Sequence, residues 1–425
     1  MISALNHPRP LSGNKLSVLL LILLGGMACS ASRHTKHLKN EVKTETVSPA
    51  DTLIPDKVKQ EKEIEEKMGL VPEMANDFHV ALLLPFSLHK DVLPSSKEYK
   101  VIESVSDYYQ GILLALEQLK QEGIILTLHV YDSRMDSLIT AGILRKPEMA
   151  SMDMVIGPLD QASFAATSVF CKEYDIPLVA PFAMYESRTI ANPLSFYCSP
   201  NLEAYGMKVA NYLLAQKQLG PVLYFSDGSA TDIAFKRGFL AAQKAPKIKL
   251  IERKIVTGMD PKGLLKKSDS AFNYILIPSD AEKLVNMTLR SFRGAEDDGY
   301  RMRVIGLDSW LNFRDPEMDH WEKMHAIIAT AYAIPDSSAA YSKFYASFRS
   351  EHTIPPGEYA LKGYDQMMHF GNALLTFGKF FPAYVFDTQF EGIGMDFFWK
   401  NSGNGVQNKS VRLLQYQSFY FKQLK

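Results

Sequence analysis

The sequence is poor in cysteine and has no excess of charge of either sign. Its 425 residues include three cysteines, and 47 basic side chains balance 47 acidic ones. A balanced chain without a basic stripe has no electrostatic footprint for nucleic acid or for an anionic membrane surface. So few cysteines cannot form a disulfide framework, and the fold must depend on a large apolar core. We expect Cys171, in a helical pattern, and Cys198, in a strand-like one, to be buried and reduced.

The sequence also lacks the short motifs of common enzyme classes. It contains no Gly-x-Ser-x-Gly elbow, no His-Glu-x-x-His, no phosphate-binding Gly-x-x-x-x-Gly-Lys and no Cys-x-x-Cys pair. A catalytic dyad formed only in space would leave no such signature. The sequence therefore predicts a protein that is not an enzyme and that needs neither a metal nor another cofactor.

No apolar run is long enough to cross a membrane. The longest run near the N-terminus, "LSVLLLILL" at 16–24, follows Arg9 and Lys15 and is broken at Gly25 and Gly26. A spanning helix needs about 20 apolar residues, so this pattern predicts a secretory signal peptide over residues 1–28.

Cys29 follows Gly26-Met27-Ala28, an arrangement that resembles a bacterial lipobox. In that motif the chain is cut before the cysteine, whose thiol then carries lipid. The usual leucine three residues before the cysteine is Gly26 here, and the same small residues suit an ordinary signal peptidase. Lipidation and plain secretion both stay open. Ser30, in place of aspartate, is similar to lipoproteins of the outer membrane, so we expect a cell-envelope location facing the periplasm.

Residues 29–77 are highly charged and have almost no aromatic side chain. Such a segment buries too little apolar surface to offset its conformational entropy. We interpret it as a flexible tether between the lipid-carrying cysteine and the folded part.

After the tether, short apolar runs alternate with helical patterns. Runs at 79–87, 124–133, 152–159 and 176–183 predict buried strands, and residues 105–123 and 161–175 predict helices. This alternation is typical of βαβ units with a parallel sheet.

The alternation then begins again, which predicts a second lobe of the same type. Strands are expected at 221–228, 248–256, 272–279, 301–309 and 326–332, with helices at 202–218, 230–244, 260–267, 280–294, 338–352 and 363–378. Residues 395–421 look like one antiparallel ribbon that turns at 402–405, where Asn-Gly suits a tight turn. Because chains of this length tend to divide into domains, we expect two similar α/β lobes.

The order "VALLLPFS", "YYQGILLALEQLK", "VYDS", "VIGPLDQASFAATSVFCKEYDIPLVAPFA", "PVLYFSDG", "GYDQMMHFGNAL" and "FEGIGMDFFW" resembles the leucine-binding type of periplasmic binding protein, over residues 78–425. The resemblance implies two Rossmann-like lobes with parallel sheets, joined by a hinge of several crossovers. It places the first lobe at about 78–200 plus a later crossover segment. The second lobe would span about 201–335 plus C-terminal elements. In this family of substrate-binding proteins of ABC transporters, a ligand is held between the lobes, which close on it.

The resemblance and the strand ends together give a set of candidate ligand contacts. In the first lobe, Gln161 or Ser163 lies near a helix N-terminus that favours an anion, although Asp160 would repel a carboxylate. The loop at 182–185 offers aromatic and thioether groups. The candidates of the second lobe follow predicted strands, where capping of the next turn is an alternative role for the Asp and Ser residues. The full set is Gln161, Ser163, Phe182, Met184, Tyr185, Asp227, Ser279, Asp308 and Trp310.

Two functions from different classes follow. The first is a membrane-anchored binding protein that captures an amino acid, peptide or related metabolite for transport or sensing, with an ABC permease as a possible partner. The second is a lipoprotein with the same fold that contacts and regulates a cell-wall (peptidoglycan) synthase. Convergent polar groups in a pocket would favour the first, and an exposed apolar patch on the outer face of a lobe would favour the second.

The substitution Cys29→Ser tests the anchor. Each buried CH₂ of an acyl chain contributes about 0.8 kcal/mol to membrane binding, so loss of the lipid should release the protein into the soluble fraction. Fractionation after a high-salt wash measures the release. A variant that stays with the membranes would contradict a lipid anchor at Cys29.

Overall fold

The computed structural model describes residues 77–88, 95–182, 191–243, 247–256, 258, 260–334, 338–386 and 389–424. They all belong to one unit, Val71–Lys425. The predicted signal peptide, Cys29 and the charged tether lie outside the described residues. None of the described helices combines the length and the hydropathy that a bilayer-spanning segment requires.

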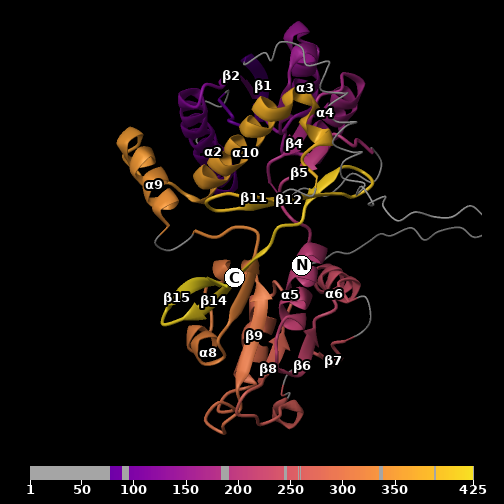
Figure 1. Cartoon of the computed structure of the whole chain (residues 1–425), viewed down its shortest axis with the longest axis vertical. Coiled ribbons are helices and arrows are strands. Elements are labelled where there is room, and N and C mark those ends of the chain that lie inside the picture. The colour runs from indigo at the N-terminus through magenta and orange to yellow at the C-terminus, as the bar shows by residue number, and fades with distance from the viewer. Residues whose placement is uncertain are drawn as a thin grey trace, which may run out of the picture. The chain divides into compact units, whose positions relative to one another are not determined.

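The first lobe is built on an eight-stranded sheet (Figure 1). Its strand order is β11-β12-β13-β5-β4-β3-β1-β2. The strands are β1 (Asp77–Leu84), β2 (Ile125–Asp132), β3 (Met154–Ile156), β4 (Leu178–Ala180), β5 (Ser195–Tyr197), β11 (Gln389–Glu391), β12 (Asp396–Asn401) and β13 (Val406–Asn408). The strands from β2 to β13 pair in parallel, as expected for βαβ units, whereas β11 and β12 add an antiparallel edge.

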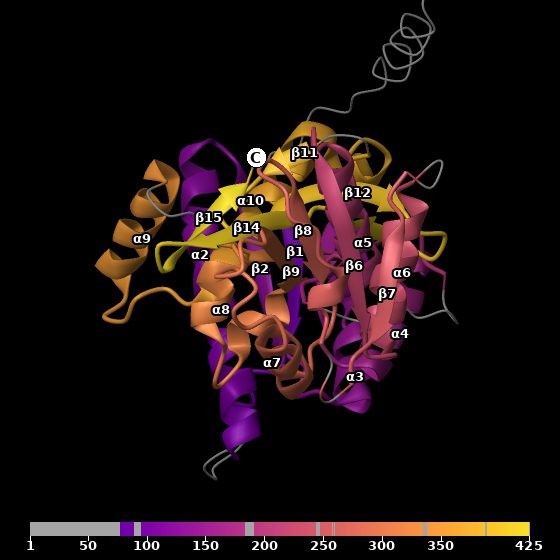
Figure 2. The same ribbon diagram turned by 90° about the horizontal axis from the view of Figure 1, so that it is seen from below.

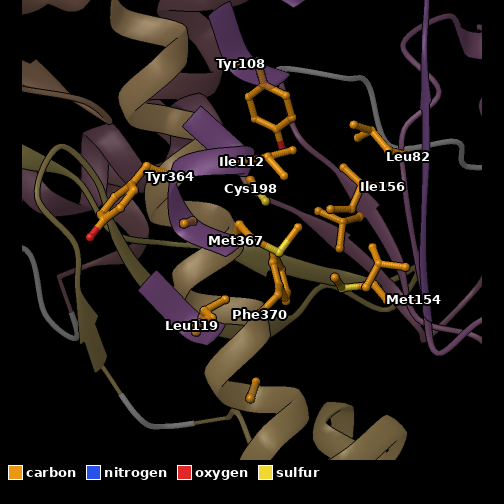
Figure 3. Packing of buried hydrophobic residues seen from close by; sticks show 14 of the residues in the cluster. Leu82, Tyr108, Ile112, Leu119, Met154, Ile156, Cys198, Tyr364, Met367 and Phe370 are labelled. Atoms are coloured by element: carbon orange, nitrogen blue, oxygen red, sulfur yellow. The ribbon is translucent and has the colours of Figure 1, made fainter. Parts of the chain in front are cut away.

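Helices cover both faces of this sheet. Helices α2 (Ser96–Gln121) and α10 (Glu358–Phe377) contribute to the largest core cluster, whose packing is seen in Figure 3. A capping box of Ser95 and Glu98 begins α2. A Cβ at Gly363 would lie 2.1 Å from the Tyr108 carbonyl oxygen, so α2 and α10 approach each other through a position that only glycine fits. The other elements of this lobe are α3 (Ser137–Leu144), η1 (Pro147–Ser151), α4 (Gln161–Glu173), α9 (Ala339–Glu351) and η4 (Gly378–Ala383).

The second lobe has a seven-stranded sheet of order β15-β14-β10-β9-β8-β6-β7 (Figure 2). Its strands are β6 (Leu219–Ser226), β7 (Leu250–Lys254), β8 (Phe272–Leu276), β9 (Met302–Leu307), β10 (Ile327–Thr330), β14 (Arg412–Gln417) and β15 (Tyr420–Leu424). Helices α5 (Leu202–Leu214) and α6 (Ala230–Ala241) pack in one core cluster. A second cluster contains side chains of α7 (Glu282–Arg290), η3 (Asp308–Asn312) and α8 (Met318–Lys323).

Two expectations about secondary structure are wrong. The helix expected at 260–267 is a single 3₁₀ turn, η2 (Lys262–Leu264). The single C-terminal ribbon is instead two antiparallel pairs in different sheets: β12 with β13 in the first lobe, and β14 with β15 in the second. The turn at 402–405 does join β12 to β13, and Cys171 and Cys198 are buried and unbridged, as predicted.

The chain passes between the two sheets three times: at 198–201, at 331–338 and at 409–411. Strand β13, which leads into the third crossover, is tied to the first crossover, because Asn408 Nδ2 donates to the Cys198 carbonyl at 2.9 Å and Gln407 Nε2 donates to the Ser199 carbonyl at 2.6 Å. These bonds make the hinge a connected unit.

Arg412, at the start of β14, extends this network to the second crossover. Its side chain is 7% exposed and forms a two-pronged ion pair with Asp396, with N–O distances of 2.6 and 3.0 Å. It also donates to the carbonyl oxygens of Ala333 and of the turn at 392–394. The same turn is held from its N–H side by Asp365, which accepts from Ile393, Gly394 and Met395. One guanidinium thus joins both sheets and a crossover.

The substitution Arg412→Met should lower the free energy of unfolding by about 3–5 kcal/mol, because it leaves Asp396 and several carbonyl groups buried without their partner. Urea denaturation measures the loss. Arg237→Met is the control, since the ion pair of Arg237 with Glu203 is largely exposed and contributes no more than about 1 kcal/mol. Equal losses in the two variants would contradict the role assigned to Arg412.

Candidate functional site

The predicted contacts lie beyond the carboxyl ends of parallel strands in both sheets. Ser163 follows β3 and Phe182 follows β4 in the first lobe, while Asp227, Ser279 and Asp308 follow β6, β8 and β9 in the second. Loops in this position are where open parallel sheets bind ligands.

The start of α4 carries two polar atoms that lack hydrogen-bond partners. Asp160 caps the helix, since its Oδ1 accepts from the Ser163 backbone N–H at 2.9 Å. Its second oxygen, Oδ2, is buried without a hydrogen-bond partner, and so is the Ser163 hydroxyl. A buried polar group without a partner costs about 1–3 kcal/mol. Gln161, the alternative residue, is exposed.

The other first-lobe candidates contribute packing where they are described. The Phe182 ring contacts Tyr108 and Tyr359 edge to face, with centroid distances of 5.0 and 5.1 Å. The loop before it is held by Gln366, whose Nε2 donates to the Pro181 carbonyl at 2.9 Å. Met184 and Tyr185 lie outside the described residues.

In the second lobe, three candidates form one internal network. The Ser279 hydroxyl donates to Asp227 Oδ2 at 2.5 Å, and the Trp310 indole N–H donates to the Ser279 carbonyl at 2.9 Å. Burial alone would raise the pKa of Asp227, but hydrogen bonds from Ser279 and Ser229 hold it below its ordinary value. Trp310 is fully buried and packs against Trp321. The polar groups of this network are used within the lobe.

Asp308 is also bound inside the second lobe. Its Oδ2 accepts from the Tyr205 hydroxyl at 2.6 Å. Burial raises the pKa of the Asp308 carboxyl, although the bond from Tyr205 and the positive charge of Lys362 oppose the rise. Lys362 belongs to α10 of the first lobe, so Asp308 is influenced electrostatically by the opposite lobe.

Three residues of this region were missed by the sequence analysis. Lys362 Nζ lies 5.1 Å from the ring centroid of Tyr332 and 5.0 Å from that of Tyr359, and Lys362 also pairs with Glu358. The Tyr332 hydroxyl is buried without a partner. Tyr332 directly follows β10, so the strand-end rule could have found it, whereas Lys362 comes from a helix and leaves no such signal.

The described part of the chain contains no cluster of three or more His, Cys, Asp or Glu side chains that could hold a metal ion. The side chains of the region offer hydrogen bonds, one ammonium group and aromatic faces. This chemistry suits binding of a polar organic molecule.

Asp308→Asn should flatten the pH dependence of stability. Because the folded-state pKa of Asp308 is raised, native Asp308 gives full stability below the unfolded-state value of about 3.9 and loses it as pH rises through its folded pKa. Asparagine still accepts from Tyr205 but has no such titration. Denaturation midpoints between pH 4 and 7 should therefore rise for the variant relative to the wild type as pH increases, and a constant difference would contradict the assignment.

Comparisons with known proteins show which solved structures have a similar architecture. No family model matches the chain, and no curated protein matches it. A putative branched-chain amino acid ABC transporter protein from Rhodospirillum rubrum matches with a TM-score of 0.61 and 13% identity, over 82% of this chain and 100% of that one. An ABC transporter substrate-binding protein from Desulfitobacterium hafniense in complex with Leu matches with a TM-score of 0.50 and 17% identity, over the same shares.

A third similar structure is the C-domain of LpoA from Haemophilus influenzae, described as a regulator of PBP1A. It matches with a TM-score of 0.53 and 12% identity, over 82% of this chain and 100% of that one. At these identities the comparisons establish the architecture alone. Together with the two mostly parallel, helix-covered sheets and their three crossovers, they show that the chain has the fold of the type 1 periplasmic binding proteins.

Proposed function

We propose that this chain is a non-enzymatic binding protein that captures a small polar ligand between its two lobes. The ligand class is an amino acid, a short peptide or a related metabolite. The observation that carries the proposal is the pair of buried, unpartnered polar atoms at the start of α4, Asp160 Oδ2 and Ser163 Oγ.

These two atoms favour ligand binding because protein interiors rarely leave polar groups unpaired. Their neighbours on the same loop are satisfied: Asp160 Oδ1 has its bond from Ser163 N–H, and the Thr167 hydroxyl donates to the Ser163 carbonyl at 2.9 Å. A ligand that supplies the missing hydrogen bonds converts this local cost into binding free energy.

The chemistry of the two atoms also restricts the ligand. A carboxylate oxygen accepts hydrogen bonds only, so Asp160 Oδ2 selects an ammonium, amide or hydroxyl donor. The Ser163 hydroxyl can donate or accept. We therefore propose that a donor group of the ligand, and not its carboxylate, lies at the start of α4, with Phe182 beside it.

The remaining parts of the proposal concern location and partners. We propose that Cys29 carries lipid and that the charged segment after it tethers the lobes to the outer membrane, within the periplasm. An ABC permease or a sensor would then receive the ligand. The similar substrate-binding folds support this assignment of class, and the predicted signal sequence supports export.

A second candidate function is regulation of a cell-wall synthase through direct contact. The likeness to the C-domain of LpoA favours it, and so does a group of exposed apolar side chains near the start of α3. Met135 is 50% exposed, Leu138 80% and Ile139 36%. This function would not need the unpaired atoms of α4.

A thermal-shift screen against amino acids, short peptides, nucleosides and cell-wall fragments tests the leading proposal. A ligand at 100 times its dissociation constant should stabilise the folded state by about 2.7 kcal/mol, which is readily measured. Silence across the whole panel would contradict small-ligand capture and favour the second candidate.

Variants of α4 test whether a ligand found in the screen binds at the start of this helix. Ser163→Ala removes an unpaired hydroxyl, so the melting temperature of the unliganded protein should stay the same or rise. The affinity for the ligand should fall. Asp160→Asn keeps a good helix cap but removes the negative charge, so it should weaken ligands with an ammonium group most. Leu138→Ser, on α3, is the matched control and should bind like the wild type. Unchanged affinity in both α4 variants would place the ligand elsewhere.

A further inference from the structure

A cavity of about 850 Å³ lies at the hinge and is separate from the site described above. Its lining does not include Asp160, Ser163 or Asp308. Its walls come from α5, β14 and β15 of the second lobe, from the β11–β12 hairpin of the first lobe, and from the crossovers. Small-molecule sites usually have volumes of about 300–1,000 Å³ and favour such junctions between domains.

One wall is the outer face of the β11–β12 hairpin. The strand register pairs Gln389 with Phe398 and Glu391 with Asp396, and all four residues line the cavity. The residues between them point the other way, because side chains alternate along a strand. Phe390 and Phe397 accordingly belong to the packing of the first-lobe core. The hairpin is therefore anchored on one face and presents polar groups on the other.

The charged residues of the cavity wall differ in whether they already have a partner. Arg412 and Asp396 neutralise each other. Lys208, on α5, and Glu391, on β11, both line the cavity, but neither side chain has an ion pair or hydrogen bond within the described residues. Lys409 lies on the same wall and donates to Asn201 Oδ1 at 3.1 Å. Opposite charges from the two lobes thus share a cavity without pairing with each other.

The start of α9 also lines the cavity. Ser338, its N-cap, and Ala340 line the cavity, and the first turn of this 13-residue helix carries no acidic side chain. The N-terminal end of a helix has a positive potential, so this part of the cavity wall also favours an anionic group.

We propose that the hinge cavity binds a short zwitterionic peptide that bridges the two lobes. Its carboxylate would lie near Lys208 and Lys409, and its ammonium group near Glu391. Gln389, Ser410 and Gln423, which also line the cavity, offer hydrogen bonds to the peptide groups between these ends. The proposal is independent of ligand capture at α4.

Isothermal titration of the full chain with triglycine and its end-blocked forms tests this directly. Triglycine should bind, and N-acetyl-triglycinamide, which has similar size and no charge, should not. Triglycinamide keeps only the ammonium group and N-acetyl-triglycine only the carboxylate, so each should bind more weakly than triglycine. No binding of triglycine at 10 mM, or equal binding of the doubly blocked form, would overturn the proposal.

Variants of Glu391 and Lys208 test which end of the peptide each residue contacts. Glu391→Gln should lower the affinity for triglycine about three- to fivefold and leave the affinity for N-acetyl-triglycine unchanged, as expected for a partly exposed ion pair. Lys208→Gln should lower the affinity for triglycine by a similar factor and leave the affinity for triglycinamide unchanged. Glu117→Gln, at an exposed position of α2 that lines neither site, is the matched control and should bind triglycine like the wild type. If only Ser163→Ala lost triglycine, the peptide would occupy the cleft, which would overturn the hinge site while supporting the proposed function.

Discussion

The arrangement of this molecule depends on the hydrogen bonds of one buried guanidinium. Arg412 donates to the Asp396 carboxylate and to four backbone carbonyl groups, from residues 333 and 392–394. Removing a charge from water is costly unless nearly every donor is paired, and here the donors are paired. A lysine could not reproduce the planar fork that holds the carboxylate and the carbonyls together. Because Arg412 belongs to the second sheet and its partners belong to the first-lobe hairpin and a crossover, the hinge, that hairpin and β14 form one polar unit.

The predicted contact residues of the two lobes differ in whether the fold satisfies their polar groups. In the second lobe, Asp227, Ser279 and Asp308 find partners within the lobe, so they contribute to the stability of the free protein. In the first lobe, Ser163 and Asp160 retain buried atoms without partners. The hydroxyl of Tyr332, which directly follows β10 of the second lobe, is also buried without a partner, so each lobe keeps at least one unsatisfied polar group.

The sequence predicts the sheets well because buried parallel strands appear as short continuous apolar runs, and β1, β8 and β10 are such runs. It fails where local pattern and tertiary partner disagree. Asp260 and Pro261 look like the start of a helix, yet the segment continues only as a 3₁₀ turn, because Asn273 receives the Lys266 N–H and donates to its carbonyl. The alternation over 395–421 is genuine, but nothing local tells which of two sheets each strand joins. Helix α3, with eight residues, is too short for its period to be visible.

The sequence likewise predicts only part of the candidate site. The rule that ligands lie beyond strand ends selects loops that the structure does place after parallel strands, but it could not rank the residues on them. Ser163 and Gln161 are two positions apart on α4, so the helix turns one inward and the other to solvent. Whether an aspartate is already bound depends on a residue distant in sequence, as Tyr205 is from Asp308. A polar side chain that the fold has satisfied stabilises the protein, and one that the fold leaves unpaired has binding free energy still to gain. The unpaired groups of α4 and of the hinge cavity are therefore where recognition is expected to reside.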